Sequence, residues 1–258
     1  MAVRAKKHLG QHFLTDKNAA AKIVNALQGE GRFKTVLEVG PGMGVLSDFL
    51  LLNKNYTTWL IDIDRESIQY LREKYPELDQ RLILGDFLNL DFEQLFDEKI
   101  AIIGNFPYNI SSQILFKILE QRNRVVEMVG MFQKEVAQRC IAMPGTKEYG
   151  ILSVFLQAYY NLEYLFTVKP GSFNPPPKVL SGVIRLERNR VEKLDCDEKL
   201  FWQVVKAGFN QRRKTLRNAL SSLINKDKMI ENDFLDLRAE RLSVNDFVAL
   251  TNMISETR

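Results

Sequence analysis

The chain has 258 residues, of which 45% are hydrophobic and 26% are charged, and its formal net charge is +4. This is the composition of an ordinary globular chain with room for one large domain and one small one. Its two cysteines form no CxxC pair and its two histidines cannot complete a zinc motif, so we expect no metal site, no disulfide framework and a reducing, cytoplasmic compartment. No apolar run approaches the roughly 20 residues of a membrane span, so we expect no membrane partner.

The positive charge is concentrated toward the two ends of the chain. The first fifteen residues contain Arg4, Lys6 and Lys7 and no acidic residue. Residues 199–226 contain seven Lys or Arg and no Asp or Glu. The centre of this second basic stretch consists of Arg212, Arg213, Lys214 and Arg217. Two basic regions around a near-neutral middle favour a polyanionic partner, although a solvated helix face stays open as the alternative for the central cluster.

The first predicted elements are a helix and a strand that leads into a glycine-rich loop. After a basic arm, residues 1–14, either Thr15 or Asp16 can cap a helix whose apolar residues follow helical spacing. Residues 35–39 read as a buried strand, and the three glycines of loop 40–44 let the backbone turn tightly and approach a ligand. The spacing is GxGxG, which differs from the GxGxxG of nicotinamide-binding folds. A helix over about residues 45–52 is expected to follow the loop.

The next predicted strands also end in groups that suit a nucleoside. The second strand ends in Asp62, about twenty residues beyond the glycine loop, where a ribose diol would be held. Asp64, on the same loop, is expected to cap a helix over residues 65–75. The third strand leads to Asp86 and Phe87, an acceptor and a ring for an adenine, although an acid such as Asp86, taken alone, more often caps a turn than binds a ligand. The fourth, residues 100–104, leads directly to Asn105. The carboxyl ends of parallel strands share one sheet edge, so we expect these groups to form one site.

The stretch Asn105–Ser111 has the groups needed to alkylate an exocyclic amine on a nucleobase. The carboxamide oxygen of Asn105 and the backbone carbonyl of Pro107 can accept the two amine hydrogens, which aims the nitrogen lone pair at an electrophilic methyl. Tyr108 would stack on the ring. Catalysis of this kind is positioning and electrostatics and needs neither a metal nor a strong base. The alternative is a helix-start turn with Asn105 as the cap and Pro107 in the first turn.

The remaining sequence predicts further elements and a domain boundary. Helices are expected over 111–120 and 133–142 and from 149, strands over 125–132 and 179–186, and short helices from about 199, 214, 228 and 243. The aromatic stretch 155–166 is assigned to the core and not to a binding platform. Pro175–Pro177 cannot continue a central strand and should form a stiff loop near the active edge. The charged stretch 187–198 is the predicted boundary between a domain of residues 1–188 and a helical RNA- or subunit-binding domain of residues 189–258.

These stretches resemble the motifs of a known family. Glu38–Ser47 looks like the S-adenosylmethionine loop of class I methyltransferases, and Asn105–Ser111 resembles the NLPYNIS signature of the ribosomal RNA adenine dimethyltransferases. Lys7–Leu14, Phe173–Val179 and Phe209–Asn218 are similar to the same family. The resemblance runs nearly end to end and is most specific to the bacterial enzymes that dimethylate two adjacent adenosines near the 3′ end of 16S rRNA. It implies an α/β fold, a Rossmann-like class I sheet with a small C-terminal all-helical domain.

The resemblance, together with the strand ends and the basic regions, assigns expected roles to individual residues. Contacts to S-adenosylmethionine are expected from His12, Leu14, Gly40, Gly42, Gly44, Asp62, Asp86, Phe87 and Asn105. The target amine would be presented by Asn105, Pro107 and Tyr108, with Phe173 on the other face of a flipped adenine. RNA contacts are expected from Lys7, Arg212, Arg213, Lys214 and Arg217. The expected partner is 16S rRNA within an immature 30S subunit, met by a monomer with a role in subunit biogenesis.

Three positions depart from the usual family pattern. Asp62 stands where Glu is common, Phe106 where Leu is usual, and His12 where Asn is frequent. None of these changes removes a required functional group. The shorter side chain of Asp62 leaves open whether its contact with the ribose is direct, water-mediated or weaker.

Two other functions remain open from the sequence. Related methyltransferases that modify large-subunit RNA and confer antibiotic resistance share the cofactor loop and an Asn-Pro-Tyr-like motif, but the loop 175–179 and residues 211–214 favour the small-subunit enzyme. The chain could also act as a non-enzymatic assembly factor that docks on an immature subunit. The intact Asn105, Pro107 and Tyr108 argue against a loss of catalysis, although a docking role beside catalysis is compatible with both basic regions.

Overall fold

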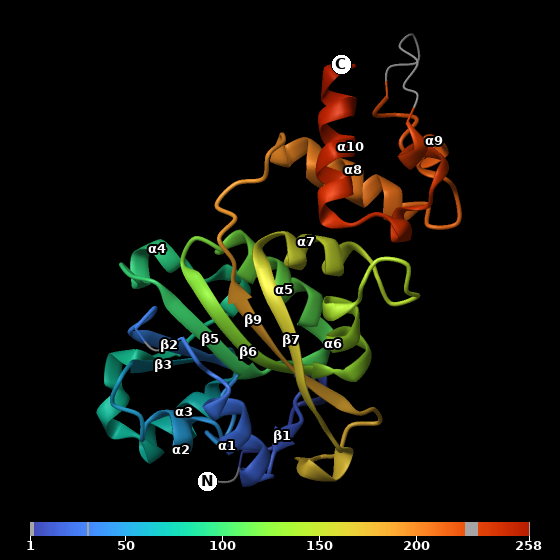
Figure 1. Ribbon diagram of the computed structural model, residues 1–258. Coiled ribbons are helices and arrows are strands. Elements are labelled where there is room, and N and C mark those ends of the chain that lie inside the picture. The colour runs from blue at the N-terminus through green and yellow to red at the C-terminus, as the bar shows by residue number, and fades with distance from the viewer. Residues whose placement is uncertain (1–2, 30, 225–231, 258) are drawn as a thin grey trace. The chain divides into compact units, whose positions relative to one another are not determined.

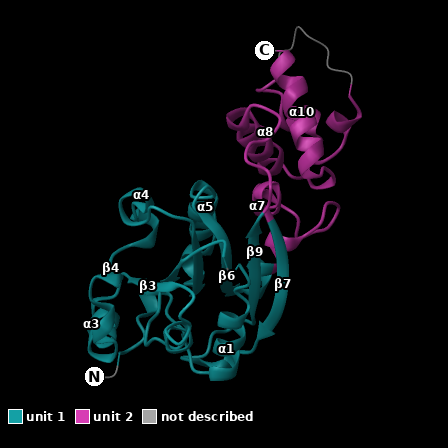
Figure 2. Cartoon of the chain, turned by 60° about the vertical axis from the view of Figure 1, so that its left-hand side comes forward, with its two compact units in different colours: residues 1–137, 161–188 teal, residues 138–160, 189–258 magenta. Residues whose placement is uncertain are grey.

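The structure is a computed structural model that describes residues 3–29, 31–224 and 232–257 (Figure 1). Contacts divide the chain into two compact units, residues 1–137 with 161–188 and residues 138–160 with 189–258 (Figure 2). The sequence placed the boundary between 188 and 189 and assigned residues 138–160 to the first domain. The structure groups these residues with the C-terminal helices because Phe155 stacks on Trp202, with ring centroids 3.8 Å apart.

Within the described residues, a seven-stranded sheet forms the centre of the first unit, in the order β4-β3-β2-β5-β6-β9-β7. Its strands are β2 (Thr35–Val39), β3 (Thr57–Asp62), β4 (Leu82–Leu84), β5 (Ile100–Asn105), β6 (Val125–Gln133), β7 (Tyr160–Val168) and β9 (Ser181–Arg188). Strands β2 to β6 pair in parallel and β9 is antiparallel to β6. A short antiparallel pair, β1 (Phe13–Leu14) and β8 (Phe173–Asn174), ties the arm to the proline loop. The predicted α/β class is confirmed.

Helices and short 3-10 turns connect the strands. The helices up to the seventh are α1 (Lys17–Asn25), α2 (Ser47–Leu50), α3 (Arg65–Lys74), α4 (Phe92–Leu95), α5 (Ser111–Glu120), α6 (Lys134–Ile141) and α7 (Ile151–Tyr159). The 3-10 turns here are η1 (Lys7–Leu9), η2 (Pro76–Arg81), η3 (Phe87–Asn89), η4 (Tyr108–Ile110) and η5 (Pro170–Ser172). An Asp side chain caps three of these helices: Asp16 accepts from Ala19 N at α1, Asp64 from Glu66 N at α3 and Asp91 from Glu93 N at α4.

The strand order places a topological switch point between β2 and β5. From β2 the chain builds outward through β3 and β4, and then returns to the other side of β2 with β5 and continues to β6. The loops after β2 and β5 therefore leave the sheet in opposite directions and open a crevice between them, which is where open α/β sheets bind ligands. The glycine loop follows β2 and Asn105 ends β5, so the fold brings the two predicted motifs to the same crevice.

The core on one face of the sheet joins the arm to the central strands. A buried cluster combines side chains of α1, α2, β2, β5 and β6 with Leu14 of β1 and Phe173 of β8. A second cluster packs α3 against β3 and β4 and includes Ile68 and Leu71. The glycine loop and the end of β5 therefore stand on closely packed strands, as a site that works by positioning requires.

The second unit is helical in the part that the structure describes beyond residue 189. It contains α8 (Glu198–Asn210), α9 (Leu216–Ala219), η6 (Asp233–Asp236), η7 (Ala239–Arg241) and α10 (Val244–Glu256). Asp197 caps α8, and Ser243 with Asp246 forms a capping box at α10. The helix expected from about residue 228 begins outside the described residues.

Two elements of the structure differ from the prediction. The strand β7 was not predicted, because the aromatic stretch 155–166 was assigned to the core. In the structure β7 lies at the end of the sheet, and most residues between Tyr160 and Val168 are exposed or half-buried. The helix expected over 45–52 is limited to Ser47–Leu50. None of the helices in the described residues combines the length and apolarity needed to cross a bilayer.

Candidate active site

The glycine loop has a backbone that only glycine adopts without strain. Gly40, Gly42 and Gly44 have φ angles of 68°, 56° and 79°. A Cβ at Gly42 would also lie 2.8 Å from the ring of Phe13, so the loop is closed against β1. Its backbone reaches the next strand, since Gly42 N donates to Asp62 Oδ2 at 3.2 Å.

Two buried acids lie beneath this loop. Burial raises the pKa of Asp62 to about 6, against hydrogen bonds from the backbone amides of Asp64 and Gly42 that favour its charged form. Burial also raises the pKa of Glu38 to about 8, although Ser47 Oγ donates to it at 2.5 Å. Asp62 is therefore ionised above about pH 6 and accepts a hydrogen bond from the loop at Gly42 N, whereas the hydrogen bond of Glu38 joins β2 to Ser47, the first residue of α2.

Asn105 ends β5 at the crevice and caps no helix. Its Nδ2 donates to the backbone carbonyl of His12 at 2.8 Å, and α5 begins six residues later at Ser111 without a side-chain cap. The predicted alternative of a helix-start turn is therefore wrong for Asn105. No hydrogen bond reaches its carboxamide oxygen from the residues that the structure describes, so this oxygen is an available acceptor in the site.

The two residues after Phe106 complete the motif. The carbonyl of Pro107 accepts two long hydrogen bonds, from Ser111 Oγ at 3.3 Å and from Ile110 N at 3.4 Å, so a substrate amine would compete with them for this oxygen. Tyr108 Oη is 2.6 Å from Ser181 Oγ, and burial raises the pKa of Tyr108, so the phenol stays protonated. The Tyr108 ring stacks on the ring of His12, with centroids 5.5 Å apart and planes 29° from parallel.

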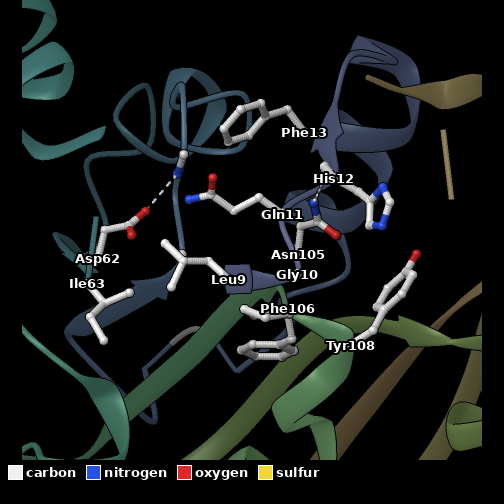
Figure 3. A pocket seen from close by; sticks show the side chains of 13 residues that line it. Leu9, Gly10, Gln11, His12, Phe13, Asp62, Ile63, Asn105, Phe106 and Tyr108 are labelled. Carbon is white, nitrogen blue, oxygen red and sulfur yellow. Dashed lines mark hydrogen bonds between the residues drawn. The ribbon is translucent and has the colours of Figure 1, made fainter. Parts of the chain in front are cut away.

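Two cavities meet at these residues. The inner one has a volume of about 60 Å³ and is lined by Gly40, Gly42, Asp62, Ile63, residues 105–108 and arm residues 9–13 (Figure 3). The outer one has a volume of about 680 Å³ and is lined by Tyr108, Gln133, residues 175–179 and arm residues that include Lys7 and His12. The arm separates them, with Gln11 lying between Asp62 and Asn105 in Figure 3.

The arm is held in place by ionic and polar contacts. Lys6 Nζ lies 2.6 Å from Asp64 Oδ1 and 3.0 Å from Glu66 Oε1. Gln11 Nε2 donates to Asp64 Oδ2 at 3.1 Å and Gln11 Oε1 accepts from Lys6 N at 2.8 Å. His12 Nδ1 lies 2.8 Å from the carbonyl of Pro175. The arm is therefore fixed at one end to Asp64 and Glu66, at the start of α3, and at the other end to the proline loop through His12.

Several residues predicted for the site lie away from the two cavities. Asp86 caps η3, since its two oxygens accept from Leu88 N at 2.9 Å and Asn89 Nδ2 at 2.8 Å, and Phe87 is buried against Phe92. The carbonyl of Gly44 accepts from Tyr75 Oη at 3.1 Å. In the structure Asp86 therefore caps a turn, as the alternative prediction had it. The contact of Asp86 with the cofactor stays a prediction.

Leu14 and Phe173 are paired in the β1–β8 ribbon and buried in the core cluster. Leu14 still lines a small cavity beside Gly40 and Asn105, whereas Phe173 lines neither of the two cavities at the motif. The structure thus does not bring Phe173 to the face opposite Tyr108, and its stacking role stays a prediction. The sequence assigned no role to four residues that line the cavities or bond to Tyr108, namely Gln11, Ile63, Gln133 and Ser181. Gln11 lies in the Lys7–Leu14 motif and Gln133 in the stretch 133–135, which also resembles the family.

The C-terminal basic cluster is partly engaged within its own unit. Arg212 Nη2 donates to the carbonyl of Lys147 at 2.5 Å, and Arg217 pairs with Asp236 at 3.0 Å. Arg213 and Lys214 are exposed. In the part of the chain that the structure describes, no group of three or more His, Cys, Asp or Glu side chains could hold a metal ion.

The comparison with known proteins decides the family. The model of the family described as ribosomal RNA adenine dimethylase matches residues 2–256. The chain belongs to this family. The predicted family and the predicted class of enzyme, a methyltransferase acting on adenine in ribosomal RNA, are thereby confirmed.

Relatives and solved structures agree with the family assignment. A protein of Cytophaga hutchinsonii is 58% identical over 253 residues, 98% of both chains, and one of Flavobacterium johnsoniae is 53% identical over 98% of this chain and 96% of its own. Both are named ribosomal RNA small subunit methyltransferase A. A dimethyladenosine transferase from Plasmodium falciparum has the same fold, with a TM-score of 0.78 at 24% identity over 95% of this chain and 98% of its own. The structure of the 23S rRNA methyltransferase ErmE has a TM-score of 0.68 at 24% identity, over 93% of this chain and 99% of its own.

Proposed function

We propose that the chain transfers methyl groups from S-adenosylmethionine to the exocyclic amines of two adjacent adenosines near the 3′ end of 16S rRNA. The observation that carries the proposal is the position of Asn105. Its carboxamide ends β5 at the switch point, where the loop of Gly40 and Gly42 and the carboxylate of Asp62 line one side and Tyr108 the other. A methyl donor can therefore be held on the side of the Asn105 carboxamide that faces the glycine loop and Asp62, and a flat base on the side that faces Tyr108.

The residues of the inner cavity fit the proposed cofactor. The positive φ angles of Gly40 and Gly42 leave room for close approach to their backbone, and the Asp62 carboxylate suits a ribose diol. Ile63 is 54% exposed although it is apolar, and it gives an adenine ring a face to lie on. When bound, S-adenosylmethionine supplies an electrophilic methyl group.

The chain's own residues would act on the target base by positioning it. Asn105 Oδ1 accepts one hydrogen of the amine and the carbonyl of Pro107 accepts the other, which turns the nitrogen lone pair away from the ring system. The face of Tyr108 supports the base once the ring of His12 moves aside. Because the strand end is fixed by the buried core, these acceptors need no rearrangement during transfer, and preorganised dipoles of this kind are the largest source of catalysis in many enzymes.

The substrate must present an unstacked adenosine. Extruding a base costs a few kcal/mol and least where it is already unpaired, so a structured RNA with loop or helix-end adenosines suits the site. Lys7 at the outer cavity and the exposed Arg213 and Lys214 supply cations for the phosphate backbone. We place the reaction in the cytoplasm, on an immature 30S subunit, with the chain acting as a monomer whose helical C-terminal part contributes to docking.

A methyl-transfer assay with labelled S-adenosylmethionine tests this proposal. The substrates are unmethylated small subunits, naked 16S rRNA and large subunits, and the labelled RNA is digested for nucleoside analysis. We expect dimethyladenosine in the small-subunit RNA. Label confined to large-subunit RNA would replace the proposal with the resistance-type activity, and tight subunit binding without transfer to any substrate would replace it with the assembly-factor function.

A further inference from the structure

We infer that Ser181 is a positioning residue that fixes the orientation of the Tyr108 ring for the incoming base. The inference rests on the proposed function, in which Tyr108 stacks on the target adenine. Ser181 Oγ lies 2.6 Å from Tyr108 Oη, and this hydrogen bond is the polar anchor of a ring that is otherwise only half-buried. In the part of the chain that the structure describes, Ser181 is the one residue hydrogen-bonded to the Tyr108 hydroxyl, whereas Ser111 Oγ donates to the Tyr108 backbone carbonyl at 3.1 Å.

Ser181 itself is held rigidly. It is the first residue of β9, where it lies opposite Gln133 of β6 in the ladder, and the carbonyl of the preceding Leu180 accepts from Lys134 N at 2.9 Å. Its side chain is fully buried, so water cannot replace its hydrogen bond. The hydroxyl of Tyr108 is thereby tied to the sheet, and its ring has one favoured plane against the outer cavity.

The hydrogen bond to Ser181 is expected to set the tilt of the Tyr108 ring, and thereby the rate of transfer, without changing the affinity for the RNA. A tilted ring would still cover the base, but it would move the amine away from Asn105 and Pro107, and a displacement of about 1 Å can cost as much as 100-fold in rate. The second methyl transfer is the more demanding step, because the monomethylated amine has a single hydrogen left to present.

A double-mutant cycle with Ser181→Ala and Tyr108→Phe tests the inference. We expect each single variant to lower kcat about tenfold with KM for the RNA and cofactor affinity unchanged, and the double variant to lose no more than either single one, because both remove the same hydrogen bond. The ratio of monomethyl to dimethyl product should rise. Additive losses, or a loss that appears only in KM, would overturn the role of Ser181.

Tyr108→Ala separates this inference from the proposed function. If removal of the ring leaves methyl transfer unchanged, the stacking role of Tyr108 is wrong and the inference falls with it. If Tyr108→Ala abolishes transfer whereas Ser181→Ala and Tyr108→Phe are fully active, the proposed function stands and the anchor is wrong. Melting temperatures of all variants identify any that fail to fold, and in that case Tyr108→Phe, which alters the partly exposed partner, decides the outcome.

A separate observation, the size of the inner cavity, carries a second inference. We propose that arm residues 6–12 are a self-occluding strap that lies in the sites of both ligands and must shift before the cofactor binds, so that the cofactor contact expected from His12 forms only in the shifted position. The inner cavity measures about 60 Å³, whereas a ligand of the cofactor's size needs roughly 300 Å³ or more. The missing space is taken by the arm, because Leu9, Gly10 and Gln11 line the cavity beside Asp62 and Asn105.

The arm also takes the polar and stacking partners that the ligands would use. His12 covers the face of Tyr108, the His12 carbonyl accepts from Asn105 Nδ2, and Gln11 and Lys6 bind Asp64 beside the ribose acid. The stacking of His12 on Tyr108 takes the place of the proposed stacking on the base, and the other contacts hold the arm beside the reacting groups. Ligand binding must therefore compete with the arm.

A reversible covalent lock tests the strap. An ideal Cβ on Gly10 lies 3.2 Å from Cγ of Asn109, and in a disulfide the Cβ of one cysteine lies about 3 Å from the sulfur of the other. Gly10→Cys with Asn109→Cys should therefore join the arm to η4 on oxidation. The pair is made with Cys196→Ser, since Cys196 is partly exposed and Cys140 is buried.

Binding of S-adenosylhomocysteine is then measured by calorimetry on the oxidised and reduced protein. We expect binding at least about 100-fold weaker in the oxidised form, because apparent affinity falls with the fraction of open molecules, and full recovery with dithiothreitol. Gly10 has a φ angle of 66°, so a cysteine there is strained, and the comparison is made within each protein. The two single cysteine variants, treated with the same oxidant, should show no difference in binding between their oxidised and reduced states. Equal binding by the locked and reduced forms would overturn the strap, whereas failure of the unsubstituted chain to bind would overturn the proposed function and the strap with it.

Discussion

Asn105→Ala should lower methyl transfer by about 100- to 1,000-fold while cofactor binding is retained, because the substitution removes a preorganised acceptor that acts on the reacting amine. The loss belongs to the chemical step, since the glycine loop and Asp62 stay in place. The substitution removes the cofactor contact expected from Asn105, but it also releases the carbonyl of His12, which Asn105 Nδ2 holds at 2.8 Å, and the freer arm should offset that loss in cofactor affinity. The measurement is single-turnover transfer from labelled S-adenosylmethionine at saturating RNA.

Asn18→Ala is the matched control for this experiment. Asn18 is an exposed residue of α1 outside both cavities, and its loss should leave single-turnover transfer unchanged. Binding to small subunits is measured in parallel and should be retained in both variants. A turnover near the unsubstituted value for Asn105→Ala would remove this residue from the mechanism. A parallel fall in cofactor affinity would assign it to cofactor binding instead.

The part of the site that the sequence predicts lies at strand ends. Asp62 and Asn105 could be placed because each follows a short apolar run directly, and the carboxyl ends of parallel strands meet at one edge. The capping roles of Asp16 and Asp64 follow from their position one residue before a helical pattern. These features depend on neighbours in the chain, and local pattern is sufficient to identify them.

The features that the sequence did not predict depend on contacts between distant segments. Ser181 meets Tyr108 across 73 positions, and Gln11 meets Asp64 across 53. No local pattern marks such pairs. The motif containing Phe173 was recognised, but its burial follows from the pairing of Leu14 with Phe173, which only the folded arm establishes. The strand β7 was missed for a related reason, because a strand at the end of the sheet with half-exposed aromatics lacks a clean alternation.

Gly130→Ala should destabilise the fold by about 3 kcal/mol, which corresponds to a fall in melting temperature of about 6–12 °C for a chain of this size. Gly130 of β6 lies opposite Gly104 of β5, and the fully buried Phe106 ring covers both. A Cβ at Gly130 would stand 2.2 Å from Phe106 Cε2, so the ring would have to move. Transfer activity should fall as well, because Phe106 lies between Asn105 and Pro107.

The control and the rescue for Gly130→Ala are both available in the chain. Gly171→Ala adds the same methyl group where no atom lies within 4 Å, and its melting temperature should stay near that of the unsubstituted chain.

The rescue follows from the departure at position 106, where the family usually has Leu. If Gly130 makes room for the Phe106 ring, the double variant Gly130→Ala, Phe106→Leu should melt above Gly130→Ala alone, because the smaller side chain removes the overlap. A double variant whose loss equals the sum of the two single losses would show that the two positions are independent. The larger ring would then need another explanation, and the packing of Phe106 on Phe132, with centroids 4.9 Å apart, is the contact to test next.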